Sequence, residues 1–245
     1  MYNYKLTIQY DGGRYRGWQR LGNGEDTIQG KLESVLSELA GENTEVTGCS
    51  RTDAGVHALA QTANVKLRRP IDPEELRQYC CRYLPRDISV TEVTLVPESF
   101  HARYDVRSKT YLYQIWNKEY PNPFLRKYSM YVPEPLNIEE MTRAAGYFIG
   151  EHDFTAFSNA KTKKKSMVRR IHFIDIQEEE GLIRIRVNGD GFLYNMVRKI
   201  AGVIIEAGLG KLDSSEIPEL IEEGDRSRLS ILAEACGLFL EKTEY

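Results

Sequence analysis

The chain has 245 residues, with 33 lysines and arginines against 36 aspartates and glutamates, so its formal net charge is −3. Hydrophobic residues make up 41% and charged residues 28%, a balance that excludes disordered, collagen-like and membrane-embedded chains. No apolar run approaches the roughly 20 residues that span a bilayer, and the first residues lack the regions of a secretion signal. We therefore expect a cytoplasmic protein with no membrane association.

Cysteine and histidine spacing gives no sign of a metal site. The four cysteines form no CxxC pair, and the four histidines stand 20 or more residues apart. Structural zinc sites use close pairs of such ligands, so we expect no metal and reduced thiols.

The middle of the chain is basic although the whole chain is acidic. Residues 105–200 carry 16 basic and 12 acidic side chains, whereas residues 201–245 carry 4 and 10. Six of the cations lie within ten residues: Lys161, Lys163, Lys164, Lys165, Arg169 and Arg170. Such a run can bind a phosphate backbone, and a solvated loop without a partner is the alternative.

In the first half, apolar periodicity and capping residues predict the order β-α-β-β-α-β. Thr27 and Gly41 bracket one helix, and Asp72 with Pro73 opens another. The predicted elements are a strand at 4–10, a helix at 28–40, strands at 44–50 and 60–67, a helix from 73 to about 84, and a strand at 88–96. This is the order of a ferredoxin-like unit.

The second half repeats this order in a looser form. The pattern predicts a strand at 109–117, a helix capped by Asn137, strands at 168–178 and 181–188, helices at about 192–207 and 214–223, and a closing strand at 236–240. We therefore predict an α+β protein of two ferredoxin-like domains, 1–104 and 105–245, with joined, mainly antiparallel sheets and a basic cleft between them.

The segment 48–58, between two predicted strands, is the most unusual part of the sequence. Ala54 and Gly55 are small, so the backbone beside Asp53 can turn sharply and a ligand can approach closely. Arg51 and Asp53 are two residues apart and point to one side if the chain is extended. A plain Asp-Ala-Gly turn is the alternative interpretation.

Residues 50–58, SRTDAGVHA, resemble the signature loop of the TruA family of tRNA pseudouridine synthases. Five further motifs extend the resemblance over nearly the whole chain: YDGxxYxGWQ at 10–19, SFHAR at 99–103, KTYLY at 109–113, EHDFTAFS at 151–158 and GFLYNMVRKIAG at 191–202. The resemblance implies a homodimer that isomerises uridine to pseudouridine at positions 38–40 of the tRNA anticodon stem-loop, without a cofactor.

The resemblance also implies roles for individual residues. Asp53 is the expected catalytic carboxylate, Arg198 its expected ion-pair partner, and Tyr111 the expected ring that stacks on the target base. Arg51 is expected to replace the flipped-out uridine or contact its phosphate. The other expected RNA contacts are Lys163, Lys164, Lys165 and Arg169.

The residues themselves leave alternatives open. Arg198 fits a surface position on its helix, and Tyr111 and Tyr113 share a strand face that fits the core. Trp18 fits the core better than an RNA contact, and we expect a structural role for the histidines at 57 and 101.

Two other functions also fit parts of the sequence. A non-catalytic RNA-binding module would display aromatic residues on its strands but would not need Asp53. A base-releasing glycosidase would normally need two carboxylates, and only Asp53 stands in a motif.

Overall fold

The computed structural model describes residues 1–22, 26–159, 166–229 and 231–245. These form two compact units, Met1–Arg107 together with Phe239–Tyr245, and Ser108–Leu238. The contacts therefore group the last residues of the chain with the first unit, whereas the sequence-based division assigned them to a 105–245 domain.

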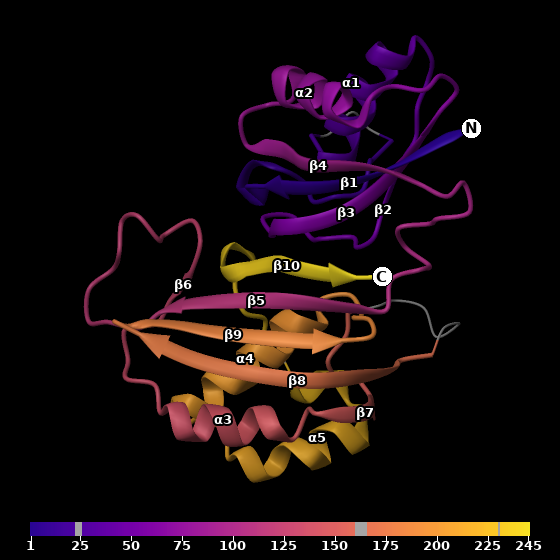
Figure 1. Ribbon diagram of the computed structural model, residues 1–245. Helices are drawn as coiled ribbons and strands as arrows, with labels where there is room; N and C mark the ends of the chain where they lie inside the picture. The colour runs from indigo at the N-terminus through magenta and orange to yellow at the C-terminus, as the bar shows by residue number, and fades with distance from the viewer. Residues whose placement is uncertain (23–25, 160–165, 230) are drawn as a thin grey trace. The chain divides into compact units, whose positions relative to one another are not determined.

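The first unit is a mainly antiparallel sheet with two helices. Its elements are β1 (Tyr2–Tyr10), α1 (Ile28–Ala40), β2 (Val46–Gly48), β3 (His57–Leu67), α2 (Pro73–Tyr83) and β4 (Ile88–Val96). The strand order is β4-β1-β3, and β2 pairs with β3 antiparallel. Part of β10 (Leu238–Glu244) lies parallel to β3, with Phe239 opposite His57. Figure 1 shows α1 and α2 on one face of this sheet.

Local side-chain bonds explain where these two helices begin. The Thr27 hydroxyl accepts a hydrogen bond from the Gly30 amide at 3.2 Å, and Asp72 accepts from the amides of residues 74 and 75. Gly41 ends α1 in the left-handed conformation, at φ +70°. Both predicted helices are confirmed.

The second unit is another mainly antiparallel sheet, with three α-helices in its described part. Its elements are β5 (Ser108–Trp116), β6 (Met130–Tyr131), α3 (Ile138–Gly146), β7 (Gly150–Asp153), β8 (Val168–Glu179), β9 (Leu182–Gly189), α4 (Met196–Gly208) and α5 (Ile217–Glu223). The strand order is β5-β9-β8-β7, and β6 pairs with β5 in parallel. The helices cover one face of this sheet in Figure 1.

The mixed α+β class is confirmed, and several predicted boundaries shift. The helix predicted from 192 begins at Met196, because Asn195 takes the left-handed conformation at φ +63°. The closing strand runs over Leu238–Glu244 rather than 236–240. Strands β6 and β7 were not predicted, since two and four residues are too few to show a period.

Among the described residues, no helix is long and apolar enough to cross a membrane.

Candidate functional site

Asp53 lies in the turn of the loop that joins β2 to β3. Its carbonyl oxygen accepts a hydrogen bond from the Val56 amide at 3.1 Å, and Gly55 takes φ +79° within this turn. A side chain is strained at that φ, which explains the glycine. The Asp53 side chain is partly exposed and Arg51 is exposed, so the predicted pair borders solvent on one loop.

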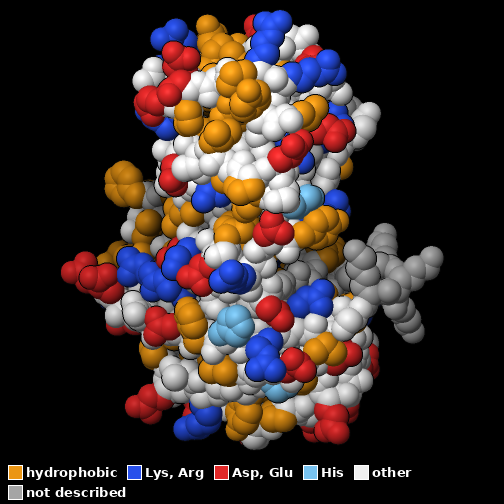
Figure 2. Space-filling model, turned by 45° about the vertical axis from the view of Figure 1, so that its right-hand side comes forward, with side chains coloured by type: hydrophobic (Ala, Val, Ile, Leu, Met, Phe, Trp, Pro, Cys, Tyr) orange, Lys and Arg blue, Asp and Glu red, His pale blue; other side chains and the backbone are white. Residues whose placement is uncertain are grey.

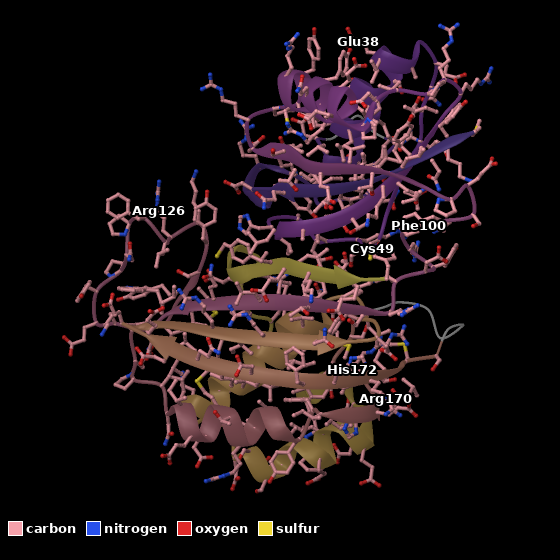
Figure 3. The ribbon with its side chains drawn as sticks, in the orientation of Figure 1. Glu38, Cys49, Phe100, Arg126, Arg170 and His172 are labelled. Atoms are coloured by element: carbon pink, nitrogen blue, oxygen red, sulfur yellow. The ribbon has the colours of Figure 1, made fainter. Side chains whose placement is uncertain are left out.

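The start of this loop is fixed by a buried glutamine. The Gln61 side chain is fully buried on β3, accepts a hydrogen bond from the Ser50 amide at 3.2 Å and donates one to the Ser50 carbonyl at 2.7 Å. Figure 3 labels Cys49, the residue before this clamp, whose own amide donates to the Thr62 carbonyl at 2.8 Å. The backbone that leads into Asp53 is therefore held by three hydrogen bonds from β3.

The residue before Asp53 is held from another side by the 10–19 segment. The Tyr10 hydroxyl lies 2.8 Å from the Thr52 hydroxyl, and the Trp18 amide donates to the Thr52 carbonyl at 3.0 Å. Trp18 is 2% exposed, which confirms the core position preferred for it. Tyr10 and Trp18 of this segment are thus buried against the loop and do not face solvent.

Two glycines of the same segment lie directly against the loop backbone. A Cβ atom on Gly12 would overlap the Val56 carbonyl, and a Cβ atom on Gly17 would lie 2.5 Å from the Thr52 carbonyl oxygen. Gly17 also has φ +92°. Only glycine allows such an approach, so the 10–19 segment shapes the loop that carries Asp53.

His57 occupies a structural position beside this loop. The side chain is 1% exposed, the Gly12 amide donates to its Nδ1 atom at 3.1 Å, and an Asp11 carboxylate oxygen lies 3.2 Å from the same atom. The Phe239 ring stacks on the imidazole at 4.7 Å. These contacts bind three separate segments of the first unit together.

In the second unit, Tyr111 and Tyr113 follow one another on the same face of β5. Tyr113 is fully buried, and its hydroxyl donates to the Glu234 carbonyl at 2.9 Å. Burial raises the pKa of this phenol well above its usual value. Tyr111 is 6% exposed and meets the Phe192 ring edge-on at 5.2 Å. Tyr113 is therefore a core residue, while Tyr111 is covered by a ring from the 191–202 motif.

Arg198 is held at the first turn of α4 by a residue far along the chain. Its Nε atom donates to the Ala233 carbonyl at 2.7 Å, and the Ala233 amide donates back to the Arg198 carbonyl at 3.2 Å. The Asn195 side-chain oxygen lies 3.5 Å from Nη1. The side chain is half-buried, so the guanidinium is oriented by its surroundings and is not the fully solvated surface group of the alternative interpretation.

Lys199, the next residue, was not singled out in the sequence although it is 4% exposed. Its ammonium donates to the Ala156 carbonyl at 3.1 Å and to the Leu229 carbonyl at 3.3 Å, and burial lowers the pKa of this amine. The bonds join the 151–158 motif to the helix that carries Arg198. A lysine directly before the apolar run at 200–205 was the available signal.

The predicted RNA-binding residues are only partly described. Arg169 is half-buried on β8, where its Nη1 atom donates to the Ser166 carbonyl at 3.0 Å. Lys163, Lys164 and Lys165 lie outside the described residues. Among the described residues on the face that Figure 2 shows, lysines and arginines are interspersed with acidic side chains.

Within the described ranges, no group of three or more His, Cys, Asp or Glu side chains could hold a metal ion.

Comparisons with known proteins identify the family of this chain. The family described as tRNA pseudouridine synthase matches residues 6–105 and 144–245. The chain is 60% identical over 241 residues to tRNA pseudouridine synthase A of Bacillus sp. strain KSM-64, covering 98% of both chains. It is 58% identical to tRNA pseudouridine synthase A 2 of Bacillus cereus and 42% identical to tRNA pseudouridine synthase A of Acetivibrio thermocellus, covering 100% of each chain.

Proposed function

Because this chain belongs to the tRNA pseudouridine synthase family, whose members are isomerases, we propose that it converts uridine to pseudouridine at positions 38–40 of the tRNA anticodon stem-loop, with Asp53 as the catalytic carboxylate. The observation that carries the assignment of Asp53 is its place in a loop fixed on two sides, by Gln61 and by the 10–19 segment.

The reaction breaks the bond between C1′ and N1 of uridine and forms a bond between C1′ and C5. The C5 proton leaves and N1 gains a proton, so atoms balance without a cofactor. A carboxylate with an ordinary pKa of about 3.9 is ionised at neutral pH. In this form Asp53 can attack C1′, attack C6 or act as a base, and each role needs the charge.

The fixed loop supports this role because catalysis depends on positioning. A misplacement of about 1 Å can cost on the order of a hundredfold in rate. The clamp by Gln61 and the close approach of Gly12 and Gly17 restrict where the backbone beside Asp53 can lie. A plain surface turn would need neither.

Arg198 and Tyr111 are the proposed partners from the second unit. A guanidinium pairs with a carboxylate through two parallel hydrogen bonds, and the bond from Nε to Ala233 fixes the plane of that group. We assign Tyr111 to stacking on the target base and to removal of the C5 proton. The Phe192 ring that covers Tyr111 would then have to give way to the uracil.

Recognition of the tRNA and the assembly of the protein remain predictions. We assign Arg51 to the space left by the flipped uridine, and Arg169 with the lysines at 163, 164 and 165 to phosphate contacts. The strand orders β4-β1-β3 and β5-β9-β8 support two ferredoxin-like halves. We also propose that the two halves join their sheets around a basic cleft. The protein is further proposed to be a cytoplasmic homodimer.

The test is the Asp53→Asn variant on unmodified tRNA transcripts, with pseudouridine mapped chemically. Asparagine has nearly the same size and suits a turn, so the fold should survive. We expect product formation to fall by several orders of magnitude while tRNA binding changes little. Asp72→Asn is the control, because asparagine caps a helix as well as aspartate and the variant loses one charge in the same unit.

Each other outcome has a distinct meaning. Activity of Asp53→Asn within about tenfold of the wild type, a difference of about 1.4 kcal/mol, would remove Asp53 as the essential carboxylate. Binding of tRNA by the wild type without any product would indicate an RNA-binding module. Release of free uracil would indicate a glycosidase.

A further inference from the structure

The loop of residues 118–128, which leads from β5 toward β6 in the second unit, has no role in the proposed chemistry. Figure 1 shows it projecting from the end of the sheet of its own unit. It lies in the part of the chain between residues 105 and 144, which the family match does not cover.

This loop exposes two aromatic rings to solvent. The Phe124 side chain is 88% exposed, more than any other large hydrophobic side chain among the described residues, and Tyr120 is 63% exposed. Scattered exposed apolar residues are common, but two exposed rings on one projecting loop each offer a flat face to a partner.

The loop backbone is held in place by its own hydrogen bonds. The Asn122 side chain accepts from the Phe124 amide at 3.0 Å, and the Tyr128 amide donates to the Leu125 carbonyl at 2.7 Å. The Trp116 indole also donates to the Tyr120 carbonyl at 2.8 Å. Because the loop is ordered before any partner arrives, binding loses less conformational entropy.

Positive charge accompanies the rings. Residues 118–128 contain Lys118, Arg126 and Lys127 against the single acid Glu119. Arg126 and Lys127 are exposed, and neither forms an ion pair within the described part of the chain. Figure 3 labels Arg126 on the projecting part of the loop.

We propose that the 118–128 loop is an additional tRNA-binding surface, which stacks an unpaired base on Phe124 and places Arg126 and Lys127 against phosphates. Exposed rings next to cations are the combination that binds single-stranded nucleic acid. RNA complements the cations better than a second copy of this chain does, because every nucleotide carries a negative charge. The inference rests on the proposed function, since tRNA is its ligand.

Truncation of the ring is the first test. Stacking contributes about 1–3 kcal/mol per base, so Phe124→Ala should weaken tRNA binding by about 5- to 150-fold. The Kd and KM for tRNA should rise together while kcat changes by less than about threefold. Phe124→Trp should restore binding because it restores the stacking surface. Tyr83→Ala is the matched control, since Tyr83 is 51% exposed on α2 of the other unit and should leave the Kd unchanged.

Neutralisation of the cations is the second test. The double variant Arg126→Gln, Lys127→Gln should flatten the log–log salt dependence of tRNA binding by about 1.4 to 1.8, since each phosphate contact contributes about 0.7 to 0.9. An unchanged slope together with an unchanged Kd for Phe124→Ala would overturn the proposal.

Photo-crosslinking identifies the partner. A photoreactive benzoylphenylalanine in place of Phe124 should crosslink to tRNA. A crosslink to a second copy of the chain that forms both with and without tRNA would show that the loop is a protein interface. That result would overturn the proposal. Failure of the proposed function can be told apart from failure of the loop proposal, because in the first case the wild type would make no pseudouridine. Wild-type pseudouridine formation with no effect of the loop variants would refute only the loop.

Discussion

Replacing Gly17 with alanine tests whether the 10–19 segment positions Asp53. The added Cβ atom would lie 2.5 Å from the Thr52 carbonyl oxygen and 3.1 Å from the Asp53 carbonyl carbon. Ordinary van der Waals contact begins at 3.4 Å, so the loop must move by about 0.9 Å. The partner atoms are backbone, and no flexible side chain can absorb the shift.

Two costs combine in this variant. An alanine at φ +92° costs about 1–2 kcal/mol, and overpacking costs about 1–3 kcal/mol more. A folded domain is stable by about 5–15 kcal/mol, so Gly17→Ala should remain mostly folded but with a lower urea midpoint. A displacement of nearly 1 Å beside Asp53 should lower the single-turnover rate by roughly a hundredfold.

Two matched variants separate these effects. Gly22→Ala places its Cβ in open space and should change neither stability nor rate. Gly41→Ala combines φ +70° with open space at the end of α1, so it should lose stability without a specific loss of rate. A folded Gly17→Ala protein that forms pseudouridine at the wild-type rate would refute the positioning role of this segment.

Three further predictions follow from single side chains. Tyr111→Phe should keep tRNA affinity and lose turnover, measured as kcat against KM, and an unchanged kcat would limit Tyr111 to packing or stacking. Burial and a hydrogen bond to Asp87 raise the pKa of Tyr15 to about 12, above its usual value near 10, so Tyr15 stabilises the fold below pH 10 and this contribution disappears as the pH rises toward 12. Urea titrations of Tyr15→Phe should therefore show a smaller loss of stability over that pH range than the wild type. Burial also raises the pKa of Cys80 to about 12, so iodoacetamide at pH 8 should modify the exposed Cys81 and spare Cys80, as peptide mass mapping would show.

The sequence alone determined the parts of the fold that depend on near neighbours. The caps at Thr27, Asp72 and Asn137 were predicted because each side chain bonds to an amide two or three residues away. The strand at 88–96 was predicted with the same limits that the structure gives, since a period of two is visible over nine residues. The motifs of the resemblance likewise identified the family, because a set of ordered short segments survives sequence divergence.

The tertiary structure decided what lies against the candidate site residues. Tyr111 and Tyr113 share one face of β5, and alternation could not tell that Phe192 covers one while the other reaches Glu234. Arg198 takes its partner 35 residues away at Ala233, and Gly17 takes its neighbour at Thr52. Such contacts join segments whose separation in the chain carries no period or cap, and only packing of the complete unit brings them together.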